Sequence, residues 1–150
     1  MGLIEDLGPG PVGLDTAIFI YFIEENPDYL ALVEPIFQAL DSGRLVGVTS
    51  AITLLEVLVV PYRVGDAGLA ERYEVILTRG RGLRMIELTL PQLRAAAQLR
   101  AATGLRAPDA LQVSAALSAG CSAFLTNDRR WPERVGGLRI LPLESYGKAP

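Results

Sequence analysis

The sequence contains no histidine, and its only cysteine is Cys121. Without histidine the chain cannot form a Ser-His-Asp triad, a Cys-His pair or a histidine-based zinc site, and it has no imidazole for acid–base catalysis. A single cysteine cannot form an internal disulfide bond, which favours a reducing compartment. Any catalysis by this chain therefore has to use carboxylates, hydroxyls, arginines or a bound metal ion.

Basic residues are absent from the first 43 positions, and lysine is almost absent from the whole chain. Residues 1–62 carry nine acidic side chains and one basic side chain, a balance of −8, whereas residues 63–150 have a balance of +5. Thirteen of the 14 basic residues are arginine, whose planar guanidinium suits bidentate contacts with phosphate. The second part of the chain can therefore face a polyanion, although solvated surface charges or coding bias explain the arginines equally well.

The sequence also lacks a long hydrophobic run. Its longest stretch without a charged residue, 110–127, is interrupted by several polar residues and a glycine, whereas a membrane span needs about 20 mostly apolar residues. The acidic N-terminus lacks the cationic opening of a secretory signal. We therefore expect a cytoplasmic protein that does not associate with membranes.

A chain of 150 residues, half of them hydrophobic, fits one domain with a substantial core. We expect a single domain over residues 1–150, with its core at about 12–143 and short flexible tails at both ends. Short apolar segments alternate with longer amphipathic ones, and we expect strands at 11–16, 45–50, 83–89, 122–126 and 138–143, and helices at 17–26, 28–43, 51 to about 61, 66–80, 91–104 and 108–120, with a helical turn at 128–137.

This alternation predicts an α/β fold, with a parallel sheet of four to five strands between two layers of helices, because right-handed crossovers place helices on both faces of the sheet. Asp28 is expected to cap the second helix and Gly43 to end it.

Four carboxylates are expected at one edge of this sheet. Asp15 and Asp128 each follow an expected strand directly, Asp109 opens the helix that precedes the strand before Asp128, and Glu56 lies in the helix after the second strand. Open parallel sheets bind their ligands beyond the carboxyl ends of the strands. Each of the three aspartates could instead be a simple helix cap.

Glu56 is harder to explain as a structural residue. It stands in the apolar run ITLLEVLVV, with Thr53 and aliphatic residues one helical turn away. Burying a carboxylate costs several kcal/mol, roughly, unless it is paired, protonated or bound to a cation. A salt bridge to Arg63 is the alternative interpretation, although Pro61 makes its geometry doubtful.

Clustered carboxylates repel one another and hold protons unless positive charge is supplied. Mg²⁺ or Mn²⁺ would supply it, since these ions prefer carboxylate and water oxygens and can activate water against a phosphodiester. Polar residues beside the acids could hold carboxylates, water or phosphate; these are Thr16, Ser50, Thr126 and Asn127.

The segments GLDTAIF, TSAITLLEVLVVPYR, RAPDALQVSAAL and AFLTNDRRW, in this order, resemble the PIN-domain family, most closely the VapC-type toxins of toxin–antitoxin pairs. The resemblance runs from about Val12 to Leu143. It implies a three-layer α/β/α fold, a Mg²⁺- or Mn²⁺-dependent endoribonuclease, a homodimer and inhibition by a VapB-type antitoxin. The matching catalytic and metal-binding carboxylates are Asp15, Glu56, Asp109 and Asp128. The position after the motif DT, often polar in relatives, is Ala17 here.

Candidate contacts for the RNA backbone are Arg106, Arg129 and Arg130, which are equally well explained as solvated charges. Trp131 could stack on a base, but packing is the preferred interpretation. Receiver and haloacid-dehalogenase folds fit poorly, because the first lacks its acid pair and lysine here and the second lacks an aspartate at position 17. The remaining rival is a PIN-like module that binds RNA or a protein partner without catalysis.

Overall fold

A six-stranded sheet forms the centre of the protein, in a computed structural model that describes residues 2–8 and 10–147. The strand order is β3-β2-β1-β4-β6-β5, and every neighbouring pair is parallel except β5 and β6, which are antiparallel. The strands are β1 (Val12–Leu14), β2 (Gly47–Ser50), β3 (Leu83–Ile86), β4 (Ala123–Thr126), β5 (Arg134–Val135) and β6 (Leu138–Pro142).

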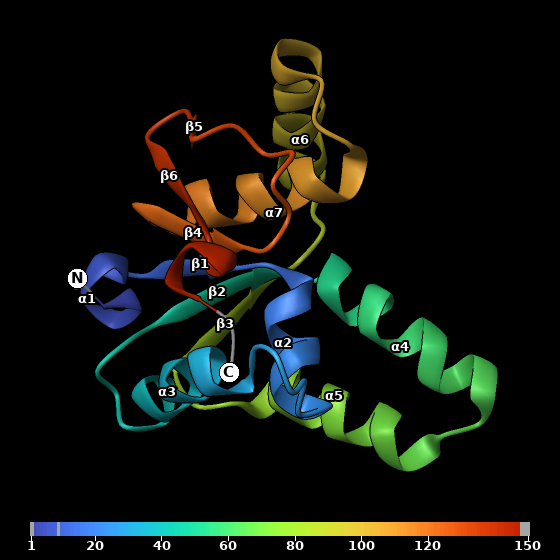
Figure 1. Ribbon diagram of the computed structural model, residues 1–150. Coiled ribbons are helices and arrows are strands. Elements are labelled where there is room, and N and C mark those ends of the chain that lie inside the picture. The colour runs from blue at the N-terminus through green and yellow to red at the C-terminus, as the bar shows by residue number, and fades with distance from the viewer. Residues whose placement is uncertain (1, 9, 148–150) are drawn as a thin grey trace.

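Helices cover both faces of the sheet (Figure 1). Helices α6 and α7 lie on one face, α2 and α3 lie on the other, and α4 and α5 form an antiparallel pair that extends away from the sheet. The helices are α1 (Leu3–Leu7), α2 (Thr16–Ile23), α3 (Leu30–Asp41), α4 (Ile52–Val64), α5 (Ala67–Arg79), α6 (Leu90–Thr103), α7 (Ala107–Ser118) and the 3₁₀ helix η1 (Leu143–Tyr146). The expected three-layer α/β/α fold is confirmed.

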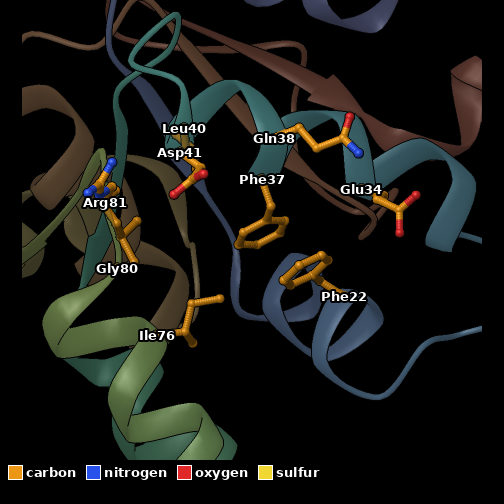
Figure 2. A pocket seen from close by; sticks show the side chains of 10 residues that line it. Phe22, Glu34, Phe37, Gln38, Leu40, Asp41, Ile76, Gly80 and Arg81 are labelled. Atoms are coloured by element: carbon orange, nitrogen blue, oxygen red, sulfur yellow. The ribbon is translucent and has the colours of Figure 1, made fainter.

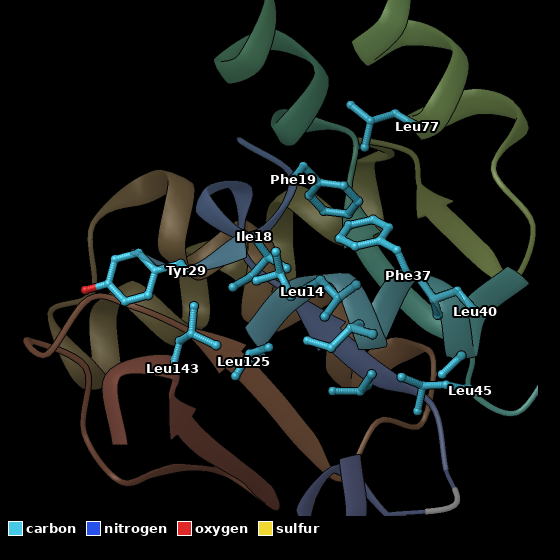
Figure 3. Packing of buried hydrophobic residues seen from close by; sticks show 14 of the residues in the cluster. Leu14, Ile18, Phe19, Tyr29, Phe37, Leu40, Leu45, Leu77, Leu125 and Leu143 are labelled. Atoms are coloured by element: carbon cyan, nitrogen blue, oxygen red, sulfur yellow. The ribbon is translucent and has the colours of Figure 1, made fainter. Parts of the chain in front are cut away.

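Successive side chains of the central strands point to opposite faces of the sheet and belong to two separate hydrophobic clusters. Leu14 and Leu125 pack with Ile18 and Phe19 in the cluster under α2 and α3 (Figure 3). Phe124, next to Leu125 in β4, belongs to the cluster on the α7 face. This alternation follows from the two-residue period of a strand, and it makes β1 and β4 buried on both sides.

Gly13 in β1 leaves room for both the Phe124 ring and helix α7. A Cβ atom at this position would stand 2.3 Å from the Phe124 ring and 3.1 Å from the Cβ of Ala116 in α7. Real side chains do not pack at such distances, so any other residue would push the helix or the ring away. Glycine here therefore sets the position of α7 relative to β1.

The predicted helical turn at 128–137 is wrong. This segment has no helix and contains β5, which forms a hairpin with β6 through Gly136 and Gly137. Gly136 has a φ of 60°, as the first position of a two-residue hairpin turn often requires, and Pro132 has no N–H for a helical hydrogen bond. The hairpin adds a sixth strand to the expected four or five.

Three further details differ from the sequence prediction. Helix α3 begins at Leu30 and not behind an Asp28 cap, because the side-chain oxygen of Asn26 accepts hydrogen bonds from the backbone N–H groups of Asp28 and Tyr29. Helix α4 continues through Pro61. Helix α1, outside the expected core, buries two leucines against α3.

No helix within the described residues has the length and apolar character needed to cross a membrane.

Candidate functional site

Asp15 lies where β1 ends and α2 begins, and its carboxylate is held by two neighbours. Oδ1 accepts a hydrogen bond of 2.9 Å from the backbone N–H of Thr16, and Oδ2 accepts one of 2.6 Å from the hydroxyl of Thr126 at the end of β4. Asp15 is therefore the cap of α2 and also a residue of the sheet edge. The cap considered from the sequence is therefore present, and the carboxylate also lies at the expected edge of the sheet.

Glu56 points from α4 towards the start of α2. Its Oε1 atom accepts a 2.6 Å hydrogen bond from the hydroxyl of Thr16. Arg63 is exposed, and it makes no ion pair with Glu56 in the part of the chain that the structure describes. The salt-bridge explanation of Glu56 is therefore wrong.

The electrostatics of Asp15 reveal which carboxylates are close to it. Burial raises the pKa of Asp15 above its ordinary value of 3.8, the hydrogen bonds from Thr126 and Thr16 oppose this increase, and the charges of Asp109 and Glu56 add to it. The charges of two carboxylates from two other elements, α7 and α4, therefore act on Asp15 at the carboxyl ends of the strands.

Asp109 and Asp128 are surrounded by arginines. Arg106 Nε donates to Asp109 Oδ2 at 3.2 Å, and Arg106 Nη2 lies 3.7 Å from Asp128 Oδ2. Arg130 binds Asp128 with both Nε and Nη2, at 2.9 Å and 2.7 Å. The hydrogen bonds and charge of Arg130 lower the pKa of Asp128 to about 2. Helix α7 begins after Arg106, so Asp109 lies in its first turn and is not its cap.

The other predicted residues divide into two groups. Thr126 belongs to the site, because its Oγ1 also accepts from the backbone N–H of Asp128 at 3.1 Å. Asn127 points elsewhere, since its side chain donates to Tyr21 and accepts from the backbone of Glu144.

Two side chains near this edge are engaged away from the carboxylates. Arg129 pairs with Glu144 at 2.5 Å. Trp131 is buried and stacked on Phe124, with ring centroids 4.8 Å apart, so the packing interpretation of this residue is confirmed.

Sequence reasoning missed Gln112, which connects the elements of the site. Its buried carboxamide contacts the backbone of Ser50 and the hydroxyls of Thr16, Thr49 and Thr53. The available signal was a polar side chain three residues after Asp109, within a helix of mostly small and apolar residues.

The donor set suits a hard divalent cation, because it consists of carboxylate oxygens and the charges of Asp109 and Glu56 raise the pKa of Asp15. Glu56 Oε2 and Asp109 Oδ1 accept no hydrogen bond from the described residues and could contact a cation. Within residues 2–8 and 10–147, however, no three acidic or cysteine side chains are grouped closely enough to hold an ion. Binding would therefore require Asp109 to rotate away from Arg106 towards Asp15 and Glu56, or water molecules to bridge the remaining distance.

A hollow elsewhere on the protein is not part of this site. It has a volume of about 430 Å³ and lies between α3, the end of α5 and the start of β3. Figure 2 shows the stacked rings of Phe22 and Phe37 beside Ile76, with Glu34 and Arg81 at the rim. None of the four carboxylates lines it.

The PIN domain family model matches residues 12–137, so the chain belongs to the PIN domain family. A search of curated proteins finds no match.

Solved structures from toxin–antitoxin pairs share the fold. DNA-bound VapBC from Salmonella typhimurium has 24% identity and a TM-score of 0.61, over 89% of this chain and 98% of that one. VapBC2 from Rickettsia felis, bound to a promoter DNA fragment, has 19% identity and a TM-score of 0.62, over 88% and 98%. VapC20 of Mycobacterium tuberculosis, described as a sarcin-ricin loop cleaving toxin, has 14% identity and a TM-score of 0.62, over 75% and 86%.

Proposed function

We propose that this protein is a metal-dependent endoribonuclease and the toxin of a type II toxin–antitoxin pair. The observation that carries the proposal is the position of the Asp15 carboxylate at the carboxyl ends of β1 and β4, where the charges of Glu56 and Asp109 contribute to its raised pKa, in a chain of the PIN domain family. The likeness to VapBC complexes supports the role in a toxin–antitoxin pair, and the likeness to a toxin described as cleaving the sarcin-ricin loop supports RNA as the substrate.

Asp15, Glu56 and Asp109 would hold Mg²⁺ or Mn²⁺, and Asp128 would complete the site or hold a second ion. Such an ion supplies a Lewis acid and an activated water for hydrolysis of a phosphodiester. The hydroxyls of Thr126 and Thr16 donate to Asp15 and Glu56, which keeps these carboxylates oriented without cancelling their charge.

Arg106 and Arg130 would bind the RNA backbone. Both guanidinium groups are more than half exposed while they contact Asp109 and Asp128, so they can exchange a carboxylate for a phosphate. Arg129, which pairs with Glu144 and not with the carboxylates of the site, would contact a more distant phosphate. In this arrangement the arginines neutralise the outer carboxylates until RNA arrives.

The proposed partners are a VapB-type antitoxin and a second copy of the chain, in the cytoplasm. Support for a protein partner comes from α4, where Leu55, Val60, Tyr62 and Val64 are each more than half exposed. Large apolar side chains gathered on one helix mark interaction surfaces more often than isolated ones do.

Purified protein free of antitoxin should cleave structured RNA when Mn²⁺ or Mg²⁺ is added. Asp15→Asn or Glu56→Gln should reduce the cleavage rate by at least about 100-fold, because a metal contributes several kcal/mol of transition-state stabilisation. Circular dichroism and melting curves would verify that both variants remain folded. The proposal fails if both variants cleave like the wild type, or if the wild type is inert across many RNAs.

One observation favours the rival function, a PIN-like module that binds RNA or a partner without catalysis. The described carboxylates do not form a closed cluster of three around a common point. A module of this kind would bind RNA with a similar affinity in the presence of Mn²⁺ or a chelator, and it would release no product. Binding and cleavage assays on the same RNA therefore separate the two functions.

A further inference from the structure

Gln112 is the most connected buried polar side chain near the site. It is 1% exposed and projects from α7 between β2, α4 and α2. Oε1 accepts from the backbone N–H of Ser50 at 3.1 Å, and Nε2 lies 2.7 Å from Thr53 Oγ1 and 3.3 Å from Thr16 Oγ1. A single carboxamide therefore joins three elements that lie beneath the carboxylates.

The orientation of this carboxamide follows from its surroundings. The backbone N–H of Ser50 can only donate a hydrogen bond, so the atom that faces it must be the side-chain oxygen of Gln112. The NH₂ group must then face Thr53 and Thr16. A flipped amide would bring two donors together beside Ser50, which burial makes costly.

The hydrogens of this network can be assigned in one consistent direction. The two N–H groups of Gln112 donate to Thr53 and Thr16, so both hydroxyls act as acceptors towards the amide. The one hydrogen of Thr16 is then available to Glu56, whose ionised carboxylate can only accept it.

The second branch of the network is also satisfied. The Thr53 hydroxyl can donate to Thr49 at 2.8 Å, and the Thr49 hydroxyl to the carbonyl of Leu14 at 3.0 Å. In this assignment every hydrogen has an acceptor, and the bonds of both branches run outward from the NH₂ group of Gln112, while its Oε1 accepts from Ser50. Hydrogen bonds in such a chain polarise one another.

We propose that Gln112 is a positioning residue for the metal site: its amide directs the hydroxyl of Thr16 towards Glu56 and thereby fixes the orientation of that carboxylate. The inference rests on the proposed function, because it assigns Glu56 to the cation. A neutral amide is well suited to this task, since an arginine in its place would neutralise the carboxylate, as Arg130 does for Asp128.

Mn²⁺ binding, followed through the electron paramagnetic resonance signal of the free ion, measures this role without RNA. Gln112→Met removes both N–H donors, and Thr16→Val removes the hydroxyl that connects the amide to Glu56. Each should weaken Mn²⁺ binding by about tenfold, which is the usual effect of losing an outer hydrogen-bond partner of a metal ligand. The double variant should be hardly weaker than either single variant, because both break the same chain.

Two matched variants separate positioning from general loss of stability. Thr16→Ser keeps the hydroxyl and should retain the Mn²⁺ affinity within about threefold of the wild type, a margin well inside the tenfold loss expected for a broken relay. Val113→Ala opens a cavity at the next position of α7, in the cluster away from the site, and should lower the melting temperature while leaving the affinity unchanged. Should Gln112→Met fail to fold, the comparison of Thr16→Val with Thr16→Ser carries the test.

A second measurement observes the amide directly. The side-chain NH₂ of Gln112 should give nuclear magnetic resonance signals that exchange slowly with solvent, because both hydrogens are buried and bonded. Thr16→Val should move one of these two signals and leave the other, which reports on Thr53, nearly unchanged. Fast exchange of both signals would overturn the assigned network.

The outcomes distinguish this inference from the proposed function. If the wild type does not bind Mn²⁺, or binds it as well after Asp15→Asn, the metal site itself is wrong. If Asp15→Asn abolishes binding but Gln112→Met and Thr16→Val leave it unchanged, the site stands and the positioning role fails. Additive losses in the double variant would also overturn the relay through Thr16.

Discussion

The two sides of the carboxylate site are held by different chemistry. Asp15 and Glu56 accept hydrogen bonds from buried or half-buried threonines, which leave their charge intact. Asp109 and Asp128 contact the exposed guanidinium groups of Arg106 and Arg130. The first side is rigid and negatively charged, whereas the second is neutralised by side chains that can move away. A cation should therefore depend most on the first side, and RNA on the second.

Mn²⁺ provides the largest test of this difference. At a concentration about 100 times its Kd, the ion should stabilise the wild type by about 2.7 kcal/mol, which corresponds to an increase in melting temperature of about 5 to 10 °C. Glu56→Gln, on the first side, should reduce this increase strongly, and Asp128→Asn, on the second side, should reduce it less, because Asp128 is already paired with Arg130. Equal increases in all three proteins would indicate weak binding at the surface.

The pH dependence of stability in a chelator should separate the two sides by sign. The pKa of Asp15 is raised, so the folded state loses stability as pH rises from about 3.8 through that higher value. Asp15→Asn should therefore melt above the wild type at pH 7. The amide can still accept from Thr16, and it can donate to the hydroxyl of Thr126.

Asp128 should behave in the opposite way. Its pKa of about 2 means that it adds stability above about 3.8, which is lost as pH falls towards 2. Asp128→Asn should melt slightly below the wild type at pH 7. The loss in the free energy of unfolding should be less than about 1 kcal/mol, because the ion pair is close to solvent. Melting curves between pH 3 and 7 would reveal both trends, and shifts of the same sign in both variants would contradict the comparison.

The smallest expected effect concerns Arg130. Arg130→Gln should weaken RNA binding only a few-fold and should reduce the slope of log affinity against log salt by about one, as for the loss of one phosphate contact. Arg79→Gln, at the end of α5, is a matched control that should change neither value. Fluorescence anisotropy with a structured RNA at several salt concentrations would test this, and an unchanged slope for Arg130→Gln would assign the residue to Asp128 alone.

Much of the fold and of the site could be predicted from the sequence. Periodicity located every helix that covers the sheet and all five parallel strands, because hydrophobic alternation and helix termini are local signals. It failed at 128–137, where the pairing of β5 with β6 depends on a strand that follows in the chain. The order of the carboxylates predicted that Asp15, Glu56, Asp109 and Asp128 would meet at one edge of the sheet. The charges of Glu56 and Asp109 do contribute to the raised pKa of Asp15.

The support around the carboxylates could not be predicted in the same way. Thr16 stands beside Asp15 in the sequence, but its hydroxyl serves Glu56, 40 residues further on. Gln112 contacts Thr16 across 96 residues. Such contacts depend on side-chain directions in the folded state, which one sequence without its structure does not specify.

The close approach of α7 to β1 at Gly13 has a consequence for how the site keeps its dimensions. Asp109 and Gln112 lie in α7, whereas Asp15 follows β1. The spacing between α7 and β1 therefore determines the distance between the carboxylates of Asp15 and Asp109. The absence of a Cβ atom at Gly13 permits this spacing. A position with no chemistry of its own thus controls how near two like charges are brought, and with it the size of the ion that they could share.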